Sequence, residues 1–226
     1  LRPASSPNVS RETFVRTLRG SRLRYHKGFG RKKALMDQQQ ATISPTIDGI
    51  LAHNRAFVER RDFERYTTDK YPDKKLAIVS CMDTRLTALL LAALGLKNGD
   101  AKIIKVAGAE VAHPFGSVMR SLLIAVCELG VEDIMIVAHT NCGAQHMSGK
   151  EMVANMERLG VSAERIEFAR HCGIDFDKWL AGFGDTEEAV RKSVDMVANH
   201  PVMPPHVRVI GFIMDSDTGE LIQVEC

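Results

Sequence analysis

In the stretch LAIVSCMDTR, residues 76–85, an apolar run leads directly into side chains that carry chemistry, and the rest of the chain is arranged around it. The run at residues 76–79 is short, apolar throughout and ends before a polar cluster, which is typical of a strand buried on both faces of a sheet. A thiol, a carboxylate and a guanidinium follow at i, i+2 and i+4, in Cys81, Asp83 and Arg85. This combination indicates a metal ligand beside an ion pair that controls it.

A second stretch, IMIVAHTNCG at residues 134–143, has the same organisation. Its apolar run is followed by His139 and Cys142, which together with Cys81 supply three soft or borderline ligands. An open-site zinc centre with one ion per chain is the natural interpretation. Taken alone, a buried Cys or His is more often an ordinary core residue, but two polar clusters at two strand ends favour the metal.

Short apolar strands alternate with helices on both sides of these stretches. We expect strands at residues 76–79, 102–106, 133–138, 207–214 and 221–224, and helices that begin near Leu86, Ser117, Ser148 and Thr186. Such alternation predicts an α/β fold with a mainly parallel central sheet flanked by helices. Ligand crevices of such sheets lie at the carboxyl ends of the strands, where Cys81 and His139 both fall.

Length and composition bound the possibilities further. The chain has 226 residues, of which 45% are hydrophobic, and we expect residues 36–226 to form a single α/β domain. No apolar run approaches the roughly 20 residues that cross a bilayer, so we expect a soluble protein with no membrane partner. The five cysteines lack the spacing of a disulfide framework, which favours a cytoplasmic, reducing location.

The net charge of +2 conceals a basic N-terminal segment. Residues 1–33 contain ten Lys or Arg and one acid, Glu12, whereas acids outnumber bases in the remainder. We expect residues 1–35 to be a disordered leader: a targeting peptide, which would place the protein in an organelle, or vector-encoded or upstream sequence. A nucleic-acid-binding arm is the least favoured interpretation, so no nucleic-acid partner is expected. Apolar residues at helical spacing from Thr42 onward then predict N-terminal helices that lie on a neighbour.

The fourth coordination position decides between an open and a closed site. If water occupies it, zinc lowers the pKa of that water from about 15.7 to roughly 7 and supplies a hydroxide. Asp83 is the alternative occupant, and a bidentate pair with Arg85 would hold its carboxylate away from the metal. Gly143 is a substrate-binding candidate, because its small size lets the backbone approach the bound oxygen. A closed structural site with Asp83 as fourth ligand remains the alternative.

Other chemistry-bearing residues have weaker sequence contexts. We expect Cys127 to be a core residue on an apolar helix face. His113 and Glu110, in a loop after a strand, are candidates to line the cleft. His171 next to Cys172 is a weak candidate for a second metal site.

Together these residues resemble the β-class carbonic anhydrases. The Cys-x-Asp-x-Arg element at residues 81–85 and the His-x-x-Cys-Gly element at residues 139–143 match the zinc motifs of that family in order and separation, and the likeness extends from about Ile47 to Val224. Three positions depart from the common pattern: Val106 stands in place of Asn, Ala138 in place of Gly, and Asn141 in place of Asp.

The resemblance implies zinc on Cys81, His139 and Cys142, and reversible hydration of CO2 to bicarbonate and a proton by zinc-bound hydroxide. It also implies an Asp83–Arg85 catalytic dyad that gates the site, and a homodimer or dimer of dimers in which the N-terminal helices pack on a partner subunit. Two alternatives remain open. One is hydrolysis of a sulfur analogue such as CS2 or COS, and the other is a catalytically weak, zinc-stabilised oligomeric binding protein.

Overall fold

The computed structural model describes residues 44–226, and the expected leader at residues 1–35 lies outside this range. The chain divides into two compact units, residues 1–65 and 66–226. Within the described residues, no helix has the length and apolar character that crossing a membrane requires.

The described part of the first unit is mainly one helix, α3 (Pro45–Glu59). It begins where the Ser44 hydroxyl accepts a hydrogen bond from the backbone N–H of Ile47, with Pro45 in the first turn, where its missing N–H costs nothing. The predicted N-terminal helix is therefore confirmed. None of its residues is buried in the single chain, and Ile50 and Val58 are more than half exposed. Packing of this helix on a partner subunit stays a prediction.

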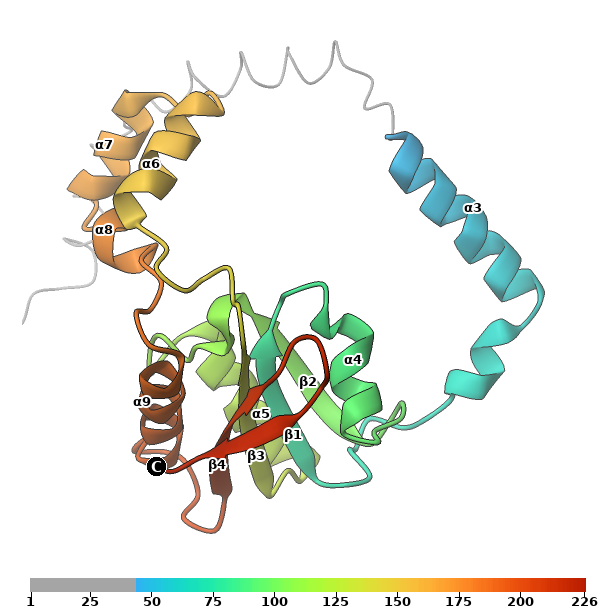
Figure 1. Ribbon diagram of the computed structural model, residues 1–226. Coiled ribbons are helices and arrows are strands. Elements are labelled where there is room, and N and C mark those ends of the chain that lie inside the picture. The colour runs from blue at the N-terminus through green and yellow to red at the C-terminus, as the bar shows by residue number, and fades with distance from the viewer. Residues whose placement is uncertain (1–43) are drawn as a thin grey trace, which may run out of the picture. The chain divides into compact units, whose positions relative to one another are not determined.

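A five-stranded sheet forms the centre of the second unit (Figure 1). Its order is β2-β1-β3-β4-β5, and the strands are β1 (Leu76–Cys81), β2 (Ala101–Val106), β3 (Asp133–His139), β4 (Arg208–Met214) and β5 (Leu221–Val224). The first four strands run parallel and β5 pairs antiparallel with β4. The predicted mainly parallel sheet is confirmed. Both β1 and β3 extend beyond their predicted ends, so Cys81 and His139 are the last residues of strands.

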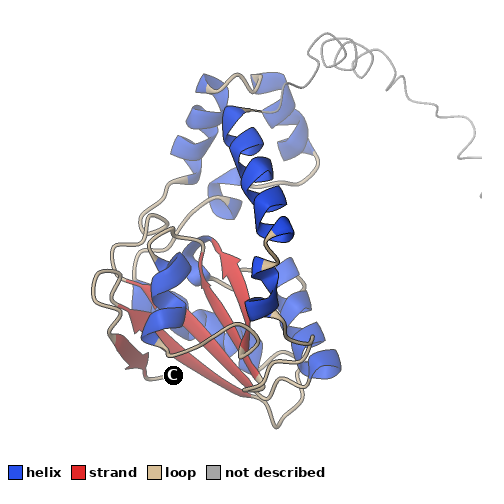
Figure 2. Ribbon diagram, turned by 90° about the vertical axis from the view of Figure 1, so that its right-hand side faces the viewer, coloured by secondary structure: helices blue, strands red, loops and turns tan. Residues whose placement is uncertain are grey.

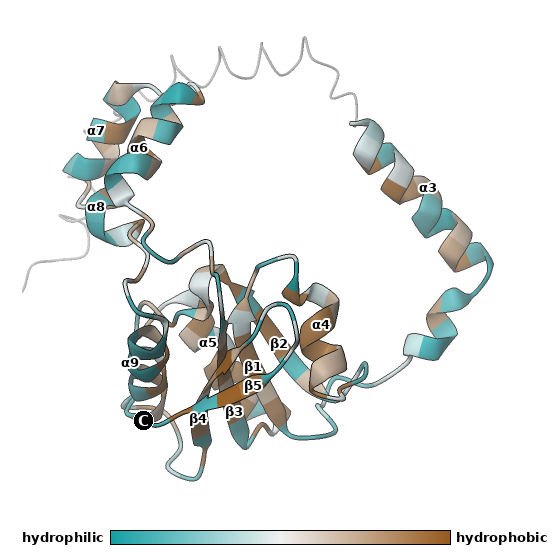
Figure 3. Ribbon diagram, viewed as in Figure 1, coloured by the Kyte–Doolittle hydropathy of each residue, from teal (hydrophilic) through white to brown (hydrophobic). Residues whose placement is uncertain are grey.

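Helices flank the sheet and close the main hydrophobic core. They are α4 (Leu86–Ala93), α5 (Ser117–Leu129) and α9 (Thr186–Ala198), of which α5 contacts β1 and β2 and α9 contacts β3 and β4. The strands that they cover are mostly hydrophobic (Figure 3). One detail differs from the sequence predictions, because Cys127, predicted to lie in the core, is exposed on α5. Helix α5 begins at Ser117, and Gly116 is its N-cap.

Three helices between β3 and α9 enclose a second, smaller core. They are α6 (Gly149–Arg158), α7 (Ala163–His171) and α8 (Phe176–Trp179), which lie together in Figure 1 and in Figure 2. The buried residues of this core are Val153, Ile166 and Phe176. The predicted helix start near Ser148 is confirmed, because the Ser148 hydroxyl accepts a hydrogen bond from the backbone N–H of Glu151 and so caps α6. The sequence pattern did not predict α7 or α8.

Candidate metal centre

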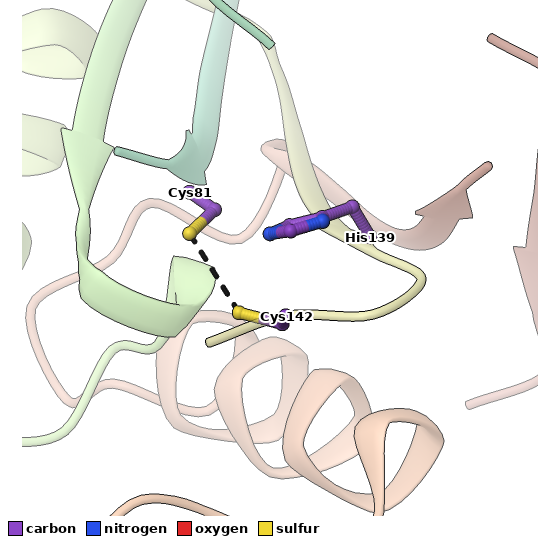
Figure 4. Close-up of side chains that lie close together, drawn as sticks. All are labelled: Cys81, His139 and Cys142. Atoms are coloured by element: carbon purple, nitrogen blue, oxygen red, sulfur yellow. Dashed lines mark hydrogen bonds between the residues drawn. The ribbon is translucent and has the colours of Figure 1, made fainter. Parts of the chain in front are cut away.

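The three predicted ligands meet at the carboxyl edge of the sheet. Cys81 ends β1 and His139 ends β3, and these neighbouring parallel strands place them side by side, while Cys142 lies in the turn after β3. Their ligand atoms all lie within 4.8 Å of one another, and all three residues are buried (Figure 4). The sulfurs of Cys81 and Cys142 are 3.8 Å apart, and both thiols are free. Two thiols and an imidazole in this arrangement form a zinc-type donor set.

His139 is oriented for metal binding by its own backbone. Its Nδ1 donates a 2.8 Å hydrogen bond to the carbonyl oxygen of Thr140, which leaves Nε2 with a lone pair directed at the thiols. The side chain is fully buried, and Nε2 has no hydrogen-bond partner among the described residues. A buried polar atom without a partner is costly. A metal ion at this position would satisfy it, so the residues present fit zinc.

The protonation of the ligand thiols differs between the two cysteines. Burial alone would raise the pKa of the Cys81 thiol, but the neighbouring His139 imidazole and the backbone of Asp83 and Gly108 outweigh it and lower the pKa to about 7. Burial raises the pKa of the Cys142 thiol. Because a metal binds the thiolate, ion binding must displace a proton from Cys142 at neutral pH.

Asp83 is held beside the ligands by Arg85. The guanidinium Nε donates to Asp83 Oδ1 at 3.0 Å and Nη2 donates to Oδ2 at 2.8 Å, so both carboxylate oxygens are engaged as predicted. These hydrogen bonds hold the pKa of Asp83 well below its usual range. Asp83 Oδ2 is 3.8 Å from Nε2 of His139. The carboxylate therefore lies next to the expected metal position while Arg85 occupies both of its oxygens.

Arg85 is itself held by two further hydrogen bonds, one of them to Ser216, which the sequence pattern did not connect to the site. Its Nη2 donates to the carbonyl oxygen of Asn141 at 2.8 Å, and its Nη1 donates to the Ser216 hydroxyl at 3.1 Å. Ser216 follows β4, and its backbone N–H donates to the Thr140 hydroxyl at 3.0 Å. One guanidinium thus joins the loop after β1, the loop after β3 and the turn after β4.

Lys105 is a second cation near the site, after Arg85, and the sequence pattern did not indicate it. It lies on β2, and its ammonium donates to the carbonyl oxygens of Cys81 at 3.0 Å and Leu86 at 3.2 Å. These two carbonyls flank the loop that carries Asp83 and Arg85. The ammonium is partly buried, which lowers its pKa, while the nearby Cys81 and Asp83 favour its charged form. Lys105 therefore ties both ends of this loop to the neighbouring strand.

A cavity of about 360 Å³ opens onto the ligands. Apolar and small residues form most of its lining: Met82, Ala107, Gly108, Gly143, Ala144 and Met147. Gly143 lies there as expected for a substrate-binding position, and an added Cβ would meet no atom within 4 Å, so packing within this chain does not require glycine. At Gly108 the φ of +68° and the close Phe183 side chain do favour glycine.

Three of the weaker sequence candidates lie elsewhere. Glu110 and His113 line a different cavity from the one that opens onto the metal ligands. Among the described residues, Cys172 is not part of a group of side chains close enough to hold a metal, so the second-site hypothesis gains no support.

Comparison with known proteins agrees with this geometry. The sequence model of a protein family, described as carbonic anhydrase, matches residues 76–221 of this chain. The protein YtiB of Bacillus subtilis (strain 168), a candidate carbonic anhydrase by its name, is 47% identical over 175 residues, covering 77% of this chain and 94% of YtiB. Beta-carbonic anhydrase 1 of Mycobacterium tuberculosis (strain ATCC 25618 / H37Rv) is 31% identical over 155 residues, covering 68% of this chain and 83% of that protein.

Solved structures and a relative with another activity complete the comparison. The crystal structure of β-carbonic anhydrase isoform I from Trichomonas vaginalis has a TM-score of 0.72 and 34% identity, covering 79% of this chain and 96% of that one. A carbon disulfide hydrolase of Acidithiobacillus thiooxidans is 28% identical over 158 residues, covering 66% of this chain and 76% of the hydrolase. With the paired motifs, the fold and the buried donor set, these matches establish that the chain is an enzyme of the β-carbonic anhydrase family.

Proposed function

We propose that the protein catalyses the reversible hydration of carbon dioxide to bicarbonate and a proton, with one zinc ion on Cys81, His139 and Cys142. The observation that carries this proposal is the unpartnered, fully buried Nε2 of His139 between two free thiols, beside a carboxylate that Arg85 engages at both oxygens. Catalytic zinc sites have three protein ligands and leave the fourth coordination position open. Three donors, with the neighbouring acid kept away from the metal, match such a site.

The chain's residues divide the work around the metal position. When bound, zinc lowers the pKa of water to about 7 and so makes a hydroxide nucleophile available at neutral pH. Asp83 accepts the hydrogen bond that orients the reacting water, because its depressed pKa keeps it ionised. Arg85 keeps that carboxylate from taking the fourth position, so the pair gates the site.

The cavity suits a small, linear substrate without charge. Its lining exposes mainly apolar atoms, with Met82 and Met147 among the side chains, and such a surface admits carbon dioxide without a competing hydrogen bond. We assign Gly143 to substrate binding, because its position leaves open space next to Cys142.

The active form is a homodimer or a dimer of dimers in this proposal. In the single chain, α3 buries none of its residues although Ile47, Ile50, Leu51 and Val58 are each more than 40% exposed. An amphipathic helix that buries nothing gains little from folding alone, which supports packing on a second copy. The five free cysteines support a cytoplasmic location.

Stopped-flow hydration of carbon dioxide by the zinc-loaded protein tests the proposal. We expect rapid proton release from neutral to mildly alkaline pH, with one zinc per chain. If zinc-loaded protein in which Asp83 and Arg85 remain paired shows no hydration over this range, the proposed function is wrong.

Hydrolysis of carbon disulfide is the second candidate function. Its support is the 28% identity to a carbon disulfide hydrolase and the apolar lining of the cavity, which a sulfur analogue would also suit. Sulfide release from carbon disulfide, measured beside carbon dioxide hydration on the same preparation, distinguishes the two. Hydration that greatly exceeds sulfide release supports the first proposal.

A further inference from the structure

A second cavity, here called the Glu110 cavity, lies in the second unit outside the metal centre. Its volume is about 750 Å³. Three segments form it: residues 110–113 after β2, residues 173–182 around α8, and the side of α9 that carries Lys192, Ser193 and Met196. This volume is in the range of small-molecule sites.

Backbone hydrogen bonds and close packing fix the walls of this cavity. The backbone N–H of Val111 donates to the buried Ser193 hydroxyl at 3.1 Å, which ties the first segment to α9. The backbone N–H of Gly182 donates to the carbonyl oxygen of Met147 at 2.9 Å, and a Cβ at Gly182 would lie 1.7 Å from the carbonyl oxygen of Ala144. The cavity is therefore preformed and does not depend on a side chain moving aside.

Among the charged side chains that line the cavity, one carboxylate has no partner. Lys192 pairs with Glu188 at 2.6 Å and Lys178 pairs with Asp175 at 3.6 Å. Among the described residues, the Glu110 carboxylate forms neither a hydrogen bond nor an ion pair, although Lys192 is near enough to influence it. Burial raises the pKa of Glu110, which shows that its charged form is poorly solvated. A cation bound here would relieve that cost.

Part of the cavity lining is apolar. Ile174, Trp179 and Met196 form this part, and Trp179 is 69% exposed. A large exposed aromatic ring in the same cavity as a partly buried carboxylate offers contact for an apolar body and a cation-attracting face. Acidic and apolar surfaces thus lie within one preformed cavity.

We propose that the Glu110 cavity binds a small molecule that carries a primary ammonium group and a compact apolar body. The ammonium group donates to Glu110, and the body contacts Ile174, Trp179 and Met196. This site is separate from the metal ligands. It nevertheless adjoins the metal cavity through Gly108, because a Cβ there would lie 3.1 Å from Glu110 Oε2 and Gly108 also lines the metal cavity.

The chain provides its own reporter for this proposal, because Trp179 is its single tryptophan. Tryptophan fluorescence of the zinc-loaded full chain is titrated with phenethylamine, with the neutral phenethyl alcohol and with the anionic hydrocinnamate. We expect a saturable change with the amine at a stoichiometry of one, confirmed by calorimetry. Binding of the alcohol and the acid should be about tenfold or more weaker, because neither carries the positive charge that pairs with the Glu110 carboxylate.

Two variants locate the binding. Glu110→Gln keeps the shape of the side chain and should weaken amine binding by about tenfold or more. Glu187→Gln removes a carboxylate that pairs with Arg191 outside the cavity, and should bind the amine as the wild type does. Unchanged zinc content and melting temperature show that both variants are folded.

Three results would overturn the proposal. The first is that the amine shows no saturable binding. The second is that the amine and the alcohol bind equally well, and the third is that Glu110→Gln binds the amine as tightly as the wild type does. The last result would place the amine elsewhere, such as at the zinc ion. None of these outcomes depends on carbon dioxide hydration, so failure here is distinct from failure of the proposed catalytic function.

Discussion

The two hydrophobic cores of the second unit differ in size and in what they support. The main core packs the sheet against its helices and includes Cys81 and Cys142. The smaller core consists of Val153, Ile166 and Phe176, and it holds together α6, α7 and α8, while residues 173–182 in and around α8 line part of the Glu110 cavity. The metal ligands are therefore built on the most buried strands, whereas one side of the second cavity rests on a core of three residues.

The largest effect should come from removing a metal ligand in the main core. Cys81→Ser replaces a thiolate by a hydroxyl that binds zinc poorly, so we expect zinc content to fall from one per chain toward zero and hydration to fall to the uncatalysed rate. Metal analysis and stopped-flow assays measure both. Cys127→Ser, at an exposed position on α5, is the matched control and should keep both. Full zinc content in Cys81→Ser would contradict the assigned ligand set.

Metal affinity should depend steeply on pH. Burial raises the pKa of Cys142, so its thiol is protonated at neutral pH and must lose that proton when zinc binds. The proton becomes easier to remove as pH rises, and the apparent affinity should increase about tenfold or more per pH unit between about pH 6 and 8. Competition with a chelator at several pH values measures this slope. A flat profile would mean that the Cys142 thiolate is not a ligand.

The Asp83–Arg85 pair should matter for catalysis more than for folding. Asp83→Asn keeps the shape but loses the charge that orients the reacting water, and kcat/KM for hydration should fall by about a hundredfold or more. Asp133→Asn is the control, because Asp133 forms a similar two-bond pair with Arg208 away from the site. Equal losses in the two variants would show that the pair near the metal is only structural.

The smaller core should be separable from the metal centre. Phe176→Ala leaves a cavity among α6, α7 and α8, and we expect it to destabilise this region by about 3 kcal/mol while zinc content stays at one. Hydrogen exchange resolved by segment measures the local loss. Phe168→Ala, at a 62% exposed position on α7, should change stability little. Loss of zinc in Phe176→Ala would show that the two regions unfold together.

The smallest effect should come from the contact that positions Arg85. Ser216→Ala removes one hydrogen bond to the guanidinium, worth about 1 kcal/mol, and kcat/KM should fall by roughly fivefold. Ser121→Ala, which removes a hydroxyl that donates to a carbonyl of its own helix, controls for loss of a serine. An unchanged kcat/KM in Ser216→Ala would show that the remaining bonds of Arg85 suffice.

The sequence was informative where burial follows a local pattern. The apolar runs before Cys81 and His139 predict strands, and two parallel strands place their carboxyl ends at one edge, so the ligand set followed from the pattern. The helix α7 was missed because only Ile166 is buried along it, while Phe168 points outward and gives the wrong periodicity. The helix α8 has four residues, too few for a periodic signal.

Long-range contacts could not be predicted in the same way. Lys105 on β2 and Ser216 after β4 reach the site through hydrogen bonds to residues at least 19 positions away in the sequence. Nothing local distinguishes this lysine from one on a solvated face. Cys127 shows the opposite error, because an apolar helix suggested a core position and the structure leaves the thiol exposed.

X-ray absorption at the zinc edge of the zinc-loaded protein at neutral pH is the sharpest test of the proposed metal centre, because it counts the ligand atoms and identifies their elements. We expect two sulfur atoms at about 2.3 Å, one imidazole nitrogen at about 2.0 to 2.1 Å, and a fourth, light atom that the Asp83→Asn substitution leaves in place. A shell without sulfur, or one in which the fourth atom is lost with the Asp83 carboxylate, would contradict it.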